Sequence, residues 1–366
     1  MSVTKKRFII VSHKYLTQPD DDFVSFLNQN KAEVVLHICH SFTDAPDRRS
    51  FYSWYKNGEL FEANQTNDYV CFPDFFIYLK ELFFTVKWIS RTKGNWDYFI
   101  GMDGLCVLFG FISGFFTKIE KTIFWAIDFV PKDRFKGFLR NWIYHSINTY
   151  SYRHVDEMWD LGARMMEARE KFLGVSPSDY KARKVVPYGV WLNSIKSVDY
   201  LECEKHTLVF MGHLIEKQGV QLVIQAISEI IKFLPEFRFK IIGGGAYKSV
   251  LEKMAADLGV QKYCTFLGKM EHIDELHKEI AKSAVAIAPY IKELDRWTYY
   301  TDPGKVKTYL ACGVPLLLTN IPWNALEIEQ QRCGFIISEK NDDIVKKTLL
   351  LLGEDLNIEY RKNALK

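Results

Sequence analysis

Hydrophobic positions recur along this chain with two different periods, and the two periods alternate from one end to the other. Short apolar runs bounded by polar or glycine-containing turns predict buried strands, whereas apolar residues at i, i+3 and i+4 predict amphipathic helices. Because strand and helix follow one another in both halves, the pattern favours open, mostly parallel sheets covered by helices. The predicted strands are 8–11, 34–38, 98–101, 122–127, 157–161, 184–186, 208–211, 239–242, 265–267, 284–288, 316–318 and 335–337.

The two series of strands predict two domains, which a length of 366 residues readily accommodates. A polar, mixed stretch at 192–206 separates the series and is the candidate linker. We therefore expect an α/β fold of two Rossmann-like, doubly wound domains, 1–191 and 207–366, which face each other across a cleft. Residues 41–70 are polar and aromatic, and we expect loops and short pieces there.

Composition narrows the class of protein. A hydrophobic content of 48% and a charged content of 25% are globular values, and a net charge of +3 gives no reason to expect nucleic acid as a partner. Seven scattered cysteines without a C-x-x-C pair favour reduced thiols in the cytosol over a disulfide framework or a zinc site. The longest apolar run, 104–116, is too short for a transmembrane helix, and the apolar part of the N-terminus is too short for a signal peptide.

Two predicted helices in the first half place cations beside apolar residues. Lys80, Lys87 and Arg91 lie along the helix 74–91, and a basic cluster lies at the start of the helix 135–150. A basic, aromatic helix is typical of a membrane surface, but an amphipathic helix packed on a sheet has much the same pattern. We therefore expect a cytoplasmic protein and hold weak peripheral contact with the inner face of the membrane as a hypothesis. The basic cluster consists of Lys132, Arg134, Lys136 and Arg140.

The stretch 301–315, TDPGKVKTYLACGVP, contains the main candidate for ligand chemistry. Pro303 and Gly304 break the chain, Lys305 stands where a helix begins, and Gly313 ends that helix. A lysine at a helix N-terminus adds a charge to free N–H groups and to the helix dipole, which together favour an anion such as a diphosphate. The alternative is a strand–helix connection with a solvated lysine.

A second turn of the same kind follows the strand 208–211. Gly212 turns the chain, Val220 begins a periodic helix, and His213 and Lys217 lie between them. A turn rich in free backbone groups and next to a cation suits phosphate. Many loops between strand and helix contain glycine and lysine, however, so this turn alone is weak support for an anion site.

Polar groups also follow other predicted strands, where the ligands of open α/β sheets gather. The simpler role for Asp103 is to cap a helix that starts near Gly104. Asp128, in WAIDFVP, either contacts an acceptor hydroxyl or takes its proton, or it forms an Asx-turn before Pro131. Glycines 243–245 either let the backbone approach a ligand or make a tight turn. The first loop lacks G-x-G-x-x-G, so we expect no dinucleotide there.

Together, these motifs resemble family 4 of the glycosyltransferases with the GT-B fold. The resemblance runs through most of the second half and keeps the family's order. It rests on GHLIEKQGV at 212–220, IIGGG at 241–245, FLG at 266–268, Pro289 and KVKTYLACGVP at 305–315, while PYGV at 187–190 is similar to the P-N-G-V that closes the family's first domain.

The resemblance implies that the second domain binds a nucleotide-diphosphate sugar and that the sugar passes to a glycan, a lipid-linked acceptor or a small acceptor. Transfer would occur in the cleft, usually with retention and without a metal ion or other cofactor. On the acceptor side we expect His13 and Asp103, with Asp128 as the catalytic contact or base. The implied donor contacts are Gly212, His213, Lys217, Gly304 and Lys305 for the diphosphate, and Gly244, Gly245, Met270 and Thr308 for the nucleotide or sugar.

The chain departs from the family's pattern at several positions. Thr308 stands where the family has a glutamate for the donor ribose, and Tyr300 stands where it has a second glutamate. Candidate substitutes for these glutamates are Glu293, Asp295 and Asp302. His213 stands where the family has an arginine, and either Gln218 or Lys217, depending on the register, stands where it has a lysine. Ile127-Asp128 lies in the loop where the family often has a histidine.

These departures leave an alternative function open. An inactive relative would bind a nucleotide sugar or a glycan without transferring the sugar. An epimerase on the same plan would need an acid and base pair that we do not find in the sequence. The chain also ends before a helix that family members commonly carry, either through truncation or through a genuine shortening.

Overall fold

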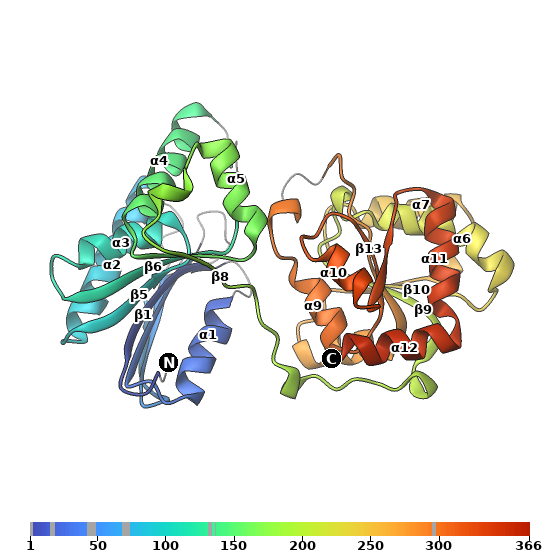
Figure 1. The fold of residues 1–366 in the computed structure, drawn as a ribbon, viewed down its shortest axis with the longest axis horizontal. Helices are drawn as coiled ribbons and strands as arrows, with labels where there is room; N and C mark the ends of the chain where they lie inside the picture. Colours follow the sequence, from blue (N-terminus) through green and yellow to red (C-terminus); the bar gives the residue numbers. More distant parts are fainter. Residues whose placement is uncertain are drawn as a thin grey trace. The chain divides into compact units, whose positions relative to one another are not determined.

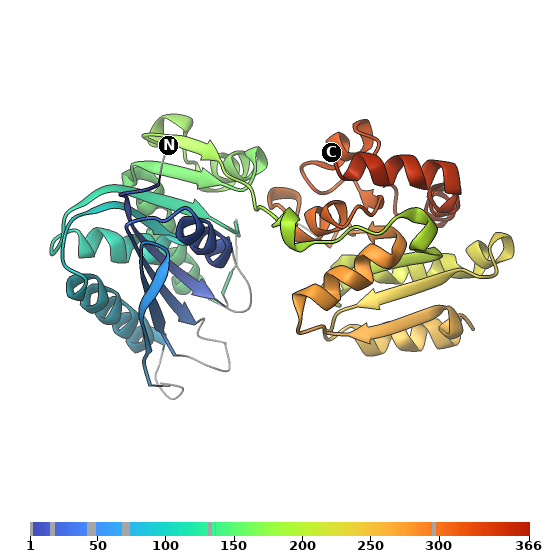
Figure 2. The same cartoon turned by 90° about the horizontal axis from the view of Figure 1, so that it is seen from below.

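The computed structural model describes residues 3–14, 19–41, 49–67, 74–130, 134–135, 137–294 and 298–366. The chain divides into two compact units, Met1–Tyr188 and Gly189–Lys366. Each unit contains one sheet with helices packed on it (Figures 1 and 2). Among the helices that the structure describes, none has both the length and the hydropathy needed to cross a bilayer.

The first unit is built on an eight-stranded sheet with the strand order β4-β3-β2-β1-β5-β6-β7-β8. Six of these strands run parallel, and their central members are buried on both faces; Ile9, Ile10 and Val11 of β1 have no exposed surface. The strand order reverses between β1 and β5, which is where open α/β sheets bind ligands. The strands are β1 Arg7–Lys14, β2 Val34–Ser41, β3 Phe51–Lys56, β4 Glu59–Gln65, β5 Trp96–Gly101, β6 Ile119–Ala126, β7 Glu157–Asp160 and β8 Arg183–Val185.

Five α-helices lie in the part of this unit that the structure describes. On one face of the sheet, α3 packs on β5 and β6 and lies between α2 and α4 (Figure 1). Asp103 caps α3, since its carboxylate accepts a hydrogen bond from the N–H of Cys106. The helices are α1 Pro19–Gln29, α2 Asp74–Arg91, α3 Gly104–Ser113, α4 Phe138–His154 and α5 Ala163–Leu173.

The second unit is built on a six-stranded, fully parallel sheet with the order β11-β10-β9-β12-β13-β14. Its order reverses between β9 and β12. The strands are β9 Glu204–Met211, β10 Arg238–Ile242, β11 Cys264–Gly268, β12 Ser283–Ala288, β13 Leu316–Thr319 and β14 Gly334–Ile337. The helices are α6 Val220–Phe233, α7 Lys248–Asp257, α8 Ile273–Lys282, α9 Gly304–Ala311, α10 Ala325–Gln330, α11 Asn341–Leu352 and α12 Glu354–Ala364.

The predicted fold class is confirmed: both units are doubly wound α/β structures with parallel sheets. Residues 41–70 require a correction, because 51–65 form an antiparallel hairpin at the edge of the first sheet rather than loops. Its turn is Asn57-Gly58, and both residues have positive φ. Asn-Gly is a favoured sequence for a two-residue hairpin turn, since such a turn needs φ > 0 at both positions.

The expected linker at 192–206 lies inside the second unit. It holds two short 3-10 turns, Leu192–Ser194 and Tyr200–Glu202. Tyr200 and Cys203 are buried in the core of this unit. The polar composition of the segment indicated a linker, but these two side chains tie it to the second sheet.

Candidate functional site

The carboxyl ends of β9 and β12 bring two loops of the second unit into direct contact. The loop after β9 contains Gly219, whose φ is +74°, and a Cβ on it would lie 1.7 Å from the carbonyl oxygen of Pro289. The N–H of Ile291 donates to the carbonyl of Lys217 at 3.0 Å. Because only glycine fits this approach, the two loops pack backbone against backbone at the point where the strand order reverses.

Lys305 places its ammonium group at this junction. A Cβ on Gly212 would lie 2.7 Å from Lys305 Nζ. The same Nζ lies 4.3 Å from the centre of the Phe210 ring and 5.1 Å from that of Tyr290. It also donates to the side-chain oxygen of Gln218. The Gly212 turn and the start of α9, which the sequence analysis treated as two separate candidates, are therefore one site.

Tyr309 explains why α9 begins at this place. Its hydroxyl accepts from the N–H of Met211 at 2.7 Å and lies 3.4 Å from the carbonyl of Ile287, so it joins α9 to the ends of β9 and β12. Burial raises the pKa of Tyr309, which keeps the hydroxyl protonated. The sequence analysis gave Tyr309 no role. Lys305 lies one turn earlier on the same helix, so the anchor at Tyr309 fixes its position.

The N-terminal turn of α9 faces the same junction. Pro303 is its N-cap, and proline has no side-chain acceptor for the first N–H groups of the helix. Gly304 is exposed, and no atom lies within 4 Å of the Cβ that a larger residue would have there. Thr308 donates to the carbonyl of Gly304 at 3.2 Å. This turn therefore offers backbone donors and a lysine to an anion.

The three glycines after β10 have two different roles. Gly243 and Gly245 have positive φ, and a Cβ on either would lie within 2.3 Å of a carbonyl oxygen, that of Gly212 or Leu214 respectively. They let the loop after β10 pack on the loop after β9, so for these two the tight-packing interpretation holds. Gly244 has open space around it and is the one of the three that a ligand can approach. Met270, half-buried after β11, packs at the edge of the adjacent core cluster.

Other predicted donor contacts have mixed outcomes. Lys217 lies half-buried and His213 exposed in the turn after β9, but the side chain that meets Lys305 is that of Gln218. Asp302 is only 2% exposed; it is ion-paired with Lys307 and accepts from Trp323 Nε1 at 3.1 Å, so it stabilises the loop rather than facing a ligand. Glu293 is exposed, and Asp295 lies outside the described residues.

The matching point of the first unit, at the ends of β1 and β5, holds a buried acidic and histidine cluster. His13 Nδ1 lies 2.6 Å from Asp103 Oδ2, and His13 Nε2 lies 3.1 Å from Glu81 Oε2. Asp103 uses its other oxygen to accept from the N–H of Cys106 at 2.9 Å, so it caps α3 and holds His13 at the same time. The sequence analysis named Asp103 and His13 but missed Glu81, which comes from α2.

The charges of this cluster follow from its contacts. Burial alone would lower the pKa of His13, but Asp103 and Glu81 outweigh burial and hold the pKa well above its usual value. Burial likewise would raise the pKa of Asp103, and His13 instead holds it below its usual range. His40, 5.7 Å away between ring centres, has its pKa lowered by burial and hydrogen-bonds to Ser50 and Thr85. The site therefore holds one imidazolium and one neutral imidazole.

Within the described residues, two groups of side chains have metal-ligating atoms within 4.8 Å of one another, and both lie in the first unit. One is His13, Asp103 and Cys106, which already satisfy one another by hydrogen bonds. The other is formed by Asp20, Asp21 and His37; here Asp20 accepts from Ser12 at 2.6 Å and lies 2.9 Å from His37 Nε2.

Asp128 follows β6, the next strand of the sheet after β5. It is half-exposed, and Arg134 Nη1 donates to its Oδ2 at 2.7 Å. Arg134 also stacks on the ring of Tyr144, 5.3 Å from its centre. This pairing fixes the Asp128 side chain just after the carboxyl end of β6. The Asx-turn alternative involves Pro131, which lies outside the described residues together with Lys132 and Lys136.

Comparison with known proteins finds similarity that centres on the second unit. The family model described as Glycosyl transferases group 1 matches residues 205–354. A GDP-mannose-dependent alpha-(1-6)-phosphatidylinositol monomannoside mannosyltransferase of Mycolicibacterium smegmatis is 32% identical over 117 residues, which are 31% of this chain and 30% of the relative. A GDP-mannose-dependent monoacylated alpha-(1-6)-phosphatidylinositol monomannoside mannosyltransferase of Corynebacterium glutamicum is 26% identical over 147 residues, which are 39% of this chain and 37% of the relative. The chain thus matches about a third of the length of these relatives.

Solved structures show the same fold over nearly the whole chain. Sucrose-phosphate synthase of Thermosynechococcus elongatus has a TM-score of 0.70 at 12% identity and covers 99% of this chain and 93% of its own. HepE of Anabaena, solved in complex with UDP, has a TM-score of 0.68 at 11% identity, with 98% and 93% covered. WaaG, a glycosyltransferase of lipopolysaccharide biosynthesis, has a TM-score of 0.62 at 14% identity, with 98% and 94% covered. Both units therefore have the folds that make up the GT-B architecture.

Proposed function

Because residues 205–354 match the family model described as Glycosyl transferases group 1, we propose that this chain transfers a sugar from a nucleotide-diphosphate sugar to an acceptor hydroxyl. The observation that supports this most directly is Lys305, whose ammonium group lies against Gly212 at the free N-terminus of α9. In the reaction the acceptor oxygen bonds to the anomeric carbon, the bond from that carbon to the diphosphate breaks, and the acceptor proton is released. The leaving nucleoside diphosphate gains negative charge as it departs, so a fixed cation and N–H groups stabilise the transition state.

The donor belongs to the second unit in this proposal. Lys305, Lys217 and the N–H groups that follow Gly212 and Gly304 hold the diphosphate. His213, exposed in the same turn, reaches its rim. Gly244, Gly245, Met270 and Thr308 contact the nucleotide or the sugar; of the first two, only Gly244 has open space. The named relatives use GDP-mannose and HepE binds UDP, so both nucleotides are candidates.

We assign the acceptor to the first unit. Asp128 contacts the acceptor hydroxyl or takes its proton, and His13 with Asp103 forms a polar wall at the neighbouring strand ends. The relatives' names specify lipid-linked mannosides, which supports a glycan or lipid-linked acceptor over a free small molecule. We further propose that no metal ion or other cofactor takes part, because the donor-site cations supply the charge that the leaving group needs, and that the anomeric configuration is retained.

The described cysteines are all free thiols, in keeping with a reducing, cytoplasmic location where nucleotide sugars are made. The catalytically inactive alternative predicts donor binding without turnover. Thermal-shift titrations with GDP-mannose, UDP-glucose and the free diphosphates test binding, since a ligand specific for the folded state raises the melting temperature. Transfer and donor-hydrolysis assays on the same protein test turnover.

Lys305→Ala is the decisive variant, with Lys253→Ala on the exposed surface of α7 as its matched control. We expect Lys305→Ala to lower kcat/KM about 100-fold or more, because one preorganised charge at a leaving group is worth roughly that much. The control should turn over like the wild type. Equal rates for wild type and Lys305→Ala would contradict the assigned role, and binding without any turnover in the wild type would favour the inactive alternative.

A further inference from the structure

The helices α2, α3 and α4 form one layer of the first unit, and the outward-facing side of that layer is a single surface. α2 contacts α3, and α3 contacts α4 (Figure 1). We call this surface the helix layer and define it by the exposed side chains of residues 75–91, of the turn 114–116 and of residues 138–154. The observations below concern this surface alone and do not depend on the donor chemistry proposed above.

On α2, the outward stripe is apolar where a helix of a soluble domain normally has charges. Phe75, Leu79 and Phe83 are spaced at i, i+4 and i+8, and all three are exposed. The side chain of Phe75 has an exposed fraction of 66%. Phe76 lies beside them and is also exposed. The opposite side of the same helix, including Trp88, is buried in the core. α2 is therefore apolar on both faces, although only one face is covered.

The same composition continues across the layer. Phe115 and Phe116, in the turn after α3, are 87% and 67% exposed. At the start of α4 the exposed residues include Phe138, which is 83% exposed, and Trp142. Isolated exposed apolar residues are normal, but a contiguous group of large ones marks a surface that binds something. Also exposed here are Leu139, Ile143 and Tyr150.

The charges on the helix layer have one sign. Among the side chains that the structure describes on α2, α3 and α4, the only acid is Glu81, which is 1% exposed and faces His13. Lys87 and Arg140 are exposed, whereas Arg91 is ion-paired with Glu62 of β4 at 2.8 Å and Arg153 with Asp179 at 3.6 Å. Lys87 Nζ lies 5.8 Å from the centre of the exposed Phe83 ring, so the charge sits beside the apolar stripe. The other cations are Lys80, Arg91, Arg140 and Arg153.

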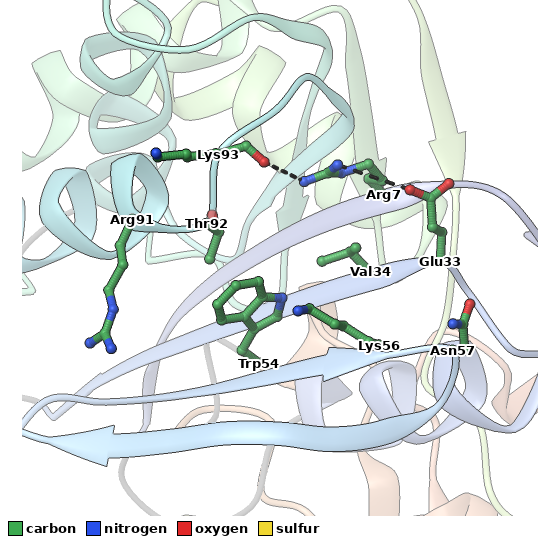
Figure 3. Close-up of a pocket in the computed structure, with 9 residues that line it drawn as sticks. All are labelled: Arg7, Glu33, Val34, Trp54, Lys56, Asn57, Arg91, Thr92 and Lys93. Atoms are coloured by element: carbon green, nitrogen blue, oxygen red, sulfur yellow. Dashed lines mark hydrogen bonds and ion pairs between the residues drawn. The ribbon is translucent and has the colours of Figure 1, made fainter.

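A pocket of about 450 Å³ extends the basic character beyond the end of α2 (Figure 3). Arg91 and Lys93 line it from the helix end, while Arg7 and Lys56 line it from the sheet. Glu33 is the one acid among its lining residues. The pocket lies at the amino ends of β1 and β2, away from the strand ends that carry His13 and Asp103. The apolar stripe of α2 thus leads into a strongly basic rim.

We propose that the helix layer docks this protein on an anionic lipid bilayer, with the exposed aromatic side chains in the interfacial region and the cations among the headgroups. Charge complementarity selects this occupant. A second copy of the chain would bring together two faces whose exposed charges, among the described side chains of α2, α3 and α4, are basic, and like charges would oppose that contact. A negatively charged membrane surface attracts each lysine or arginine and also accepts amphipathic aromatic faces.

Vesicle flotation of the full chain tests the proposal, with vesicles of phosphatidylcholine alone or mixed with phosphatidylglycerol. We expect the wild type to float with the anionic vesicles and to be released by salt, since screening weakens surface charge attraction. Little should float with the neutral vesicles. No donor or acceptor is added, so the result is independent of whether the transferase function is correct.

Two variants locate the contact. Phe138→Ser with Trp142→Ser should lower the partition coefficient about tenfold or more, by removing two interfacial side chains. Lys87→Gln should lower it about fivefold, the effect of one cation near an anionic surface. The matched controls come from the second unit: Phe233→Ser removes an exposed phenylalanine of α6, and Lys253→Gln removes an exposed cation of α7. Both should float like the wild type.

Three results would overturn the proposal. The first is a wild type that stays in the protein fraction with anionic vesicles at low salt. The second is flotation that the helix-layer variants reduce no more than the controls do. The third is a wild-type dimer in sedimentation equilibrium that the Phe138→Ser, Trp142→Ser variant converts to a monomer, because the surface would then be an interface between copies. Unfolding curves for each variant confirm that the substituted surface residues leave the fold intact.

Discussion

The two units reverse their strand order at equivalent places, between β1 and β5 and between β9 and β12, yet they hold opposite chemistry there. In the second unit, an amide oxygen, two aromatic rings and a glycine surround the ammonium group of Lys305. In the first unit, two carboxylates enclose the imidazole of His13. The topology is the same at both places, and the side chains make one a cation among neutral groups and the other a histidine between two carboxylates.

The two places are also stabilised by different means. Loops of the second unit pack backbone on backbone, which requires glycine with positive φ at Gly219, Gly243 and Gly245. The first unit connects its elements through side chains, and the contacts of His13 join β1, α2 and the start of α3. One added methyl group should therefore damage the second unit, whereas the removal of one charge should damage the first.

The largest effect is expected from Gly243→Ala. Its Cβ would lie 1.9 Å from the carbonyl oxygen of Gly212, and its φ of +139° is strained for any residue but glycine. We expect a loss of about 3 kcal/mol or more in the free energy of unfolding. Urea unfolding measures this loss. Gly244→Ala is the matched control, since nothing lies within 4 Å of its Cβ; equal losses for the two variants would refute the backbone packing described here.

Tyr309→Phe should have the next largest effect. It leaves the ring in place and removes the hydroxyl that accepts from the N–H of Met211, so a buried donor loses its partner. We expect a stability loss of about 1–3 kcal/mol, together with weaker donor binding because α9 also carries Lys305. Chemical unfolding and donor titration measure the two effects. Tyr263→Phe is the control, because the Tyr263 ring is half-exposed and stacks with Arg238; an unchanged Tyr309→Phe variant would show that the hydroxyl does not anchor the helix.

The charge network of the first unit predicts how stability depends on pH. The raised pKa of His13 means that its contribution is fully present below about pH 6.5, its unfolded value, and is lost as pH rises through the folded value. The lowered pKa of Asp103 means that its contribution is present above about pH 3.8 and is lost as pH falls. The pair therefore stabilises the unit most between these two values.

Glu81→Gln separates the loss of stability at alkaline pH from the loss at acid pH. With one carboxylate removed, the folded pKa of His13 should fall, and the alkaline loss should begin at a lower pH. The change is about 1.4 kcal/mol for each unit of pKa, measured by unfolding at neutral pH and above, with the exposed Glu120→Gln as control. If the free energy of unfolding begins to fall at the same alkaline pH as in the wild type, Glu81 does not hold the charge on His13.

Much of the fold was predictable, because the signals were local. The apolar runs marked the parallel strands, and α2 has the predicted bounds of 74–91. The edge hairpin was missed even though Asn57-Gly58 is a strong turn signal, since its strands are amphipathic and half-exposed. The linker was misjudged because only two buried residues, Tyr200 and Cys203, attach it to the second unit.

The candidate site was predictable as a list of residues but not as a set of contacts. Gly304, Lys305 and Gly212 could be named from turns and helix ends. That Gln218 touches Lys305, that Tyr309 anchors α9 and that Glu81 supports His13 depends on residues up to 98 positions apart, and no local pattern reveals such pairs. Asp302 was a plausible ligand group by composition, yet Lys307 and Trp323 bury it.

The smallest effect, and the finest test of the comparison, concerns the partner of Lys305. The family's lysine falls at Gln218 or Lys217, and the structure brings the Gln218 side chain to Lys305 Nζ. Gln218→Ala should free the ammonium group to move and raise the donor KM about fivefold, which corresponds to one hydrogen bond of about 1 kcal/mol, with kcat little changed. Lys217→Ala serves as the neighbouring comparison in initial-rate assays.

If Lys217→Ala raises KM while Gln218→Ala does not, the ligand contacts Lys217 directly and Gln218 has no part in holding Lys305. If Gln218→Ala instead lowers kcat and KM together, the hydrogen bond restrains Lys305 in the ground state. The neutral groups around Lys305 would then tune the position of a cation, whereas the carboxylates around His13 stabilise its charge.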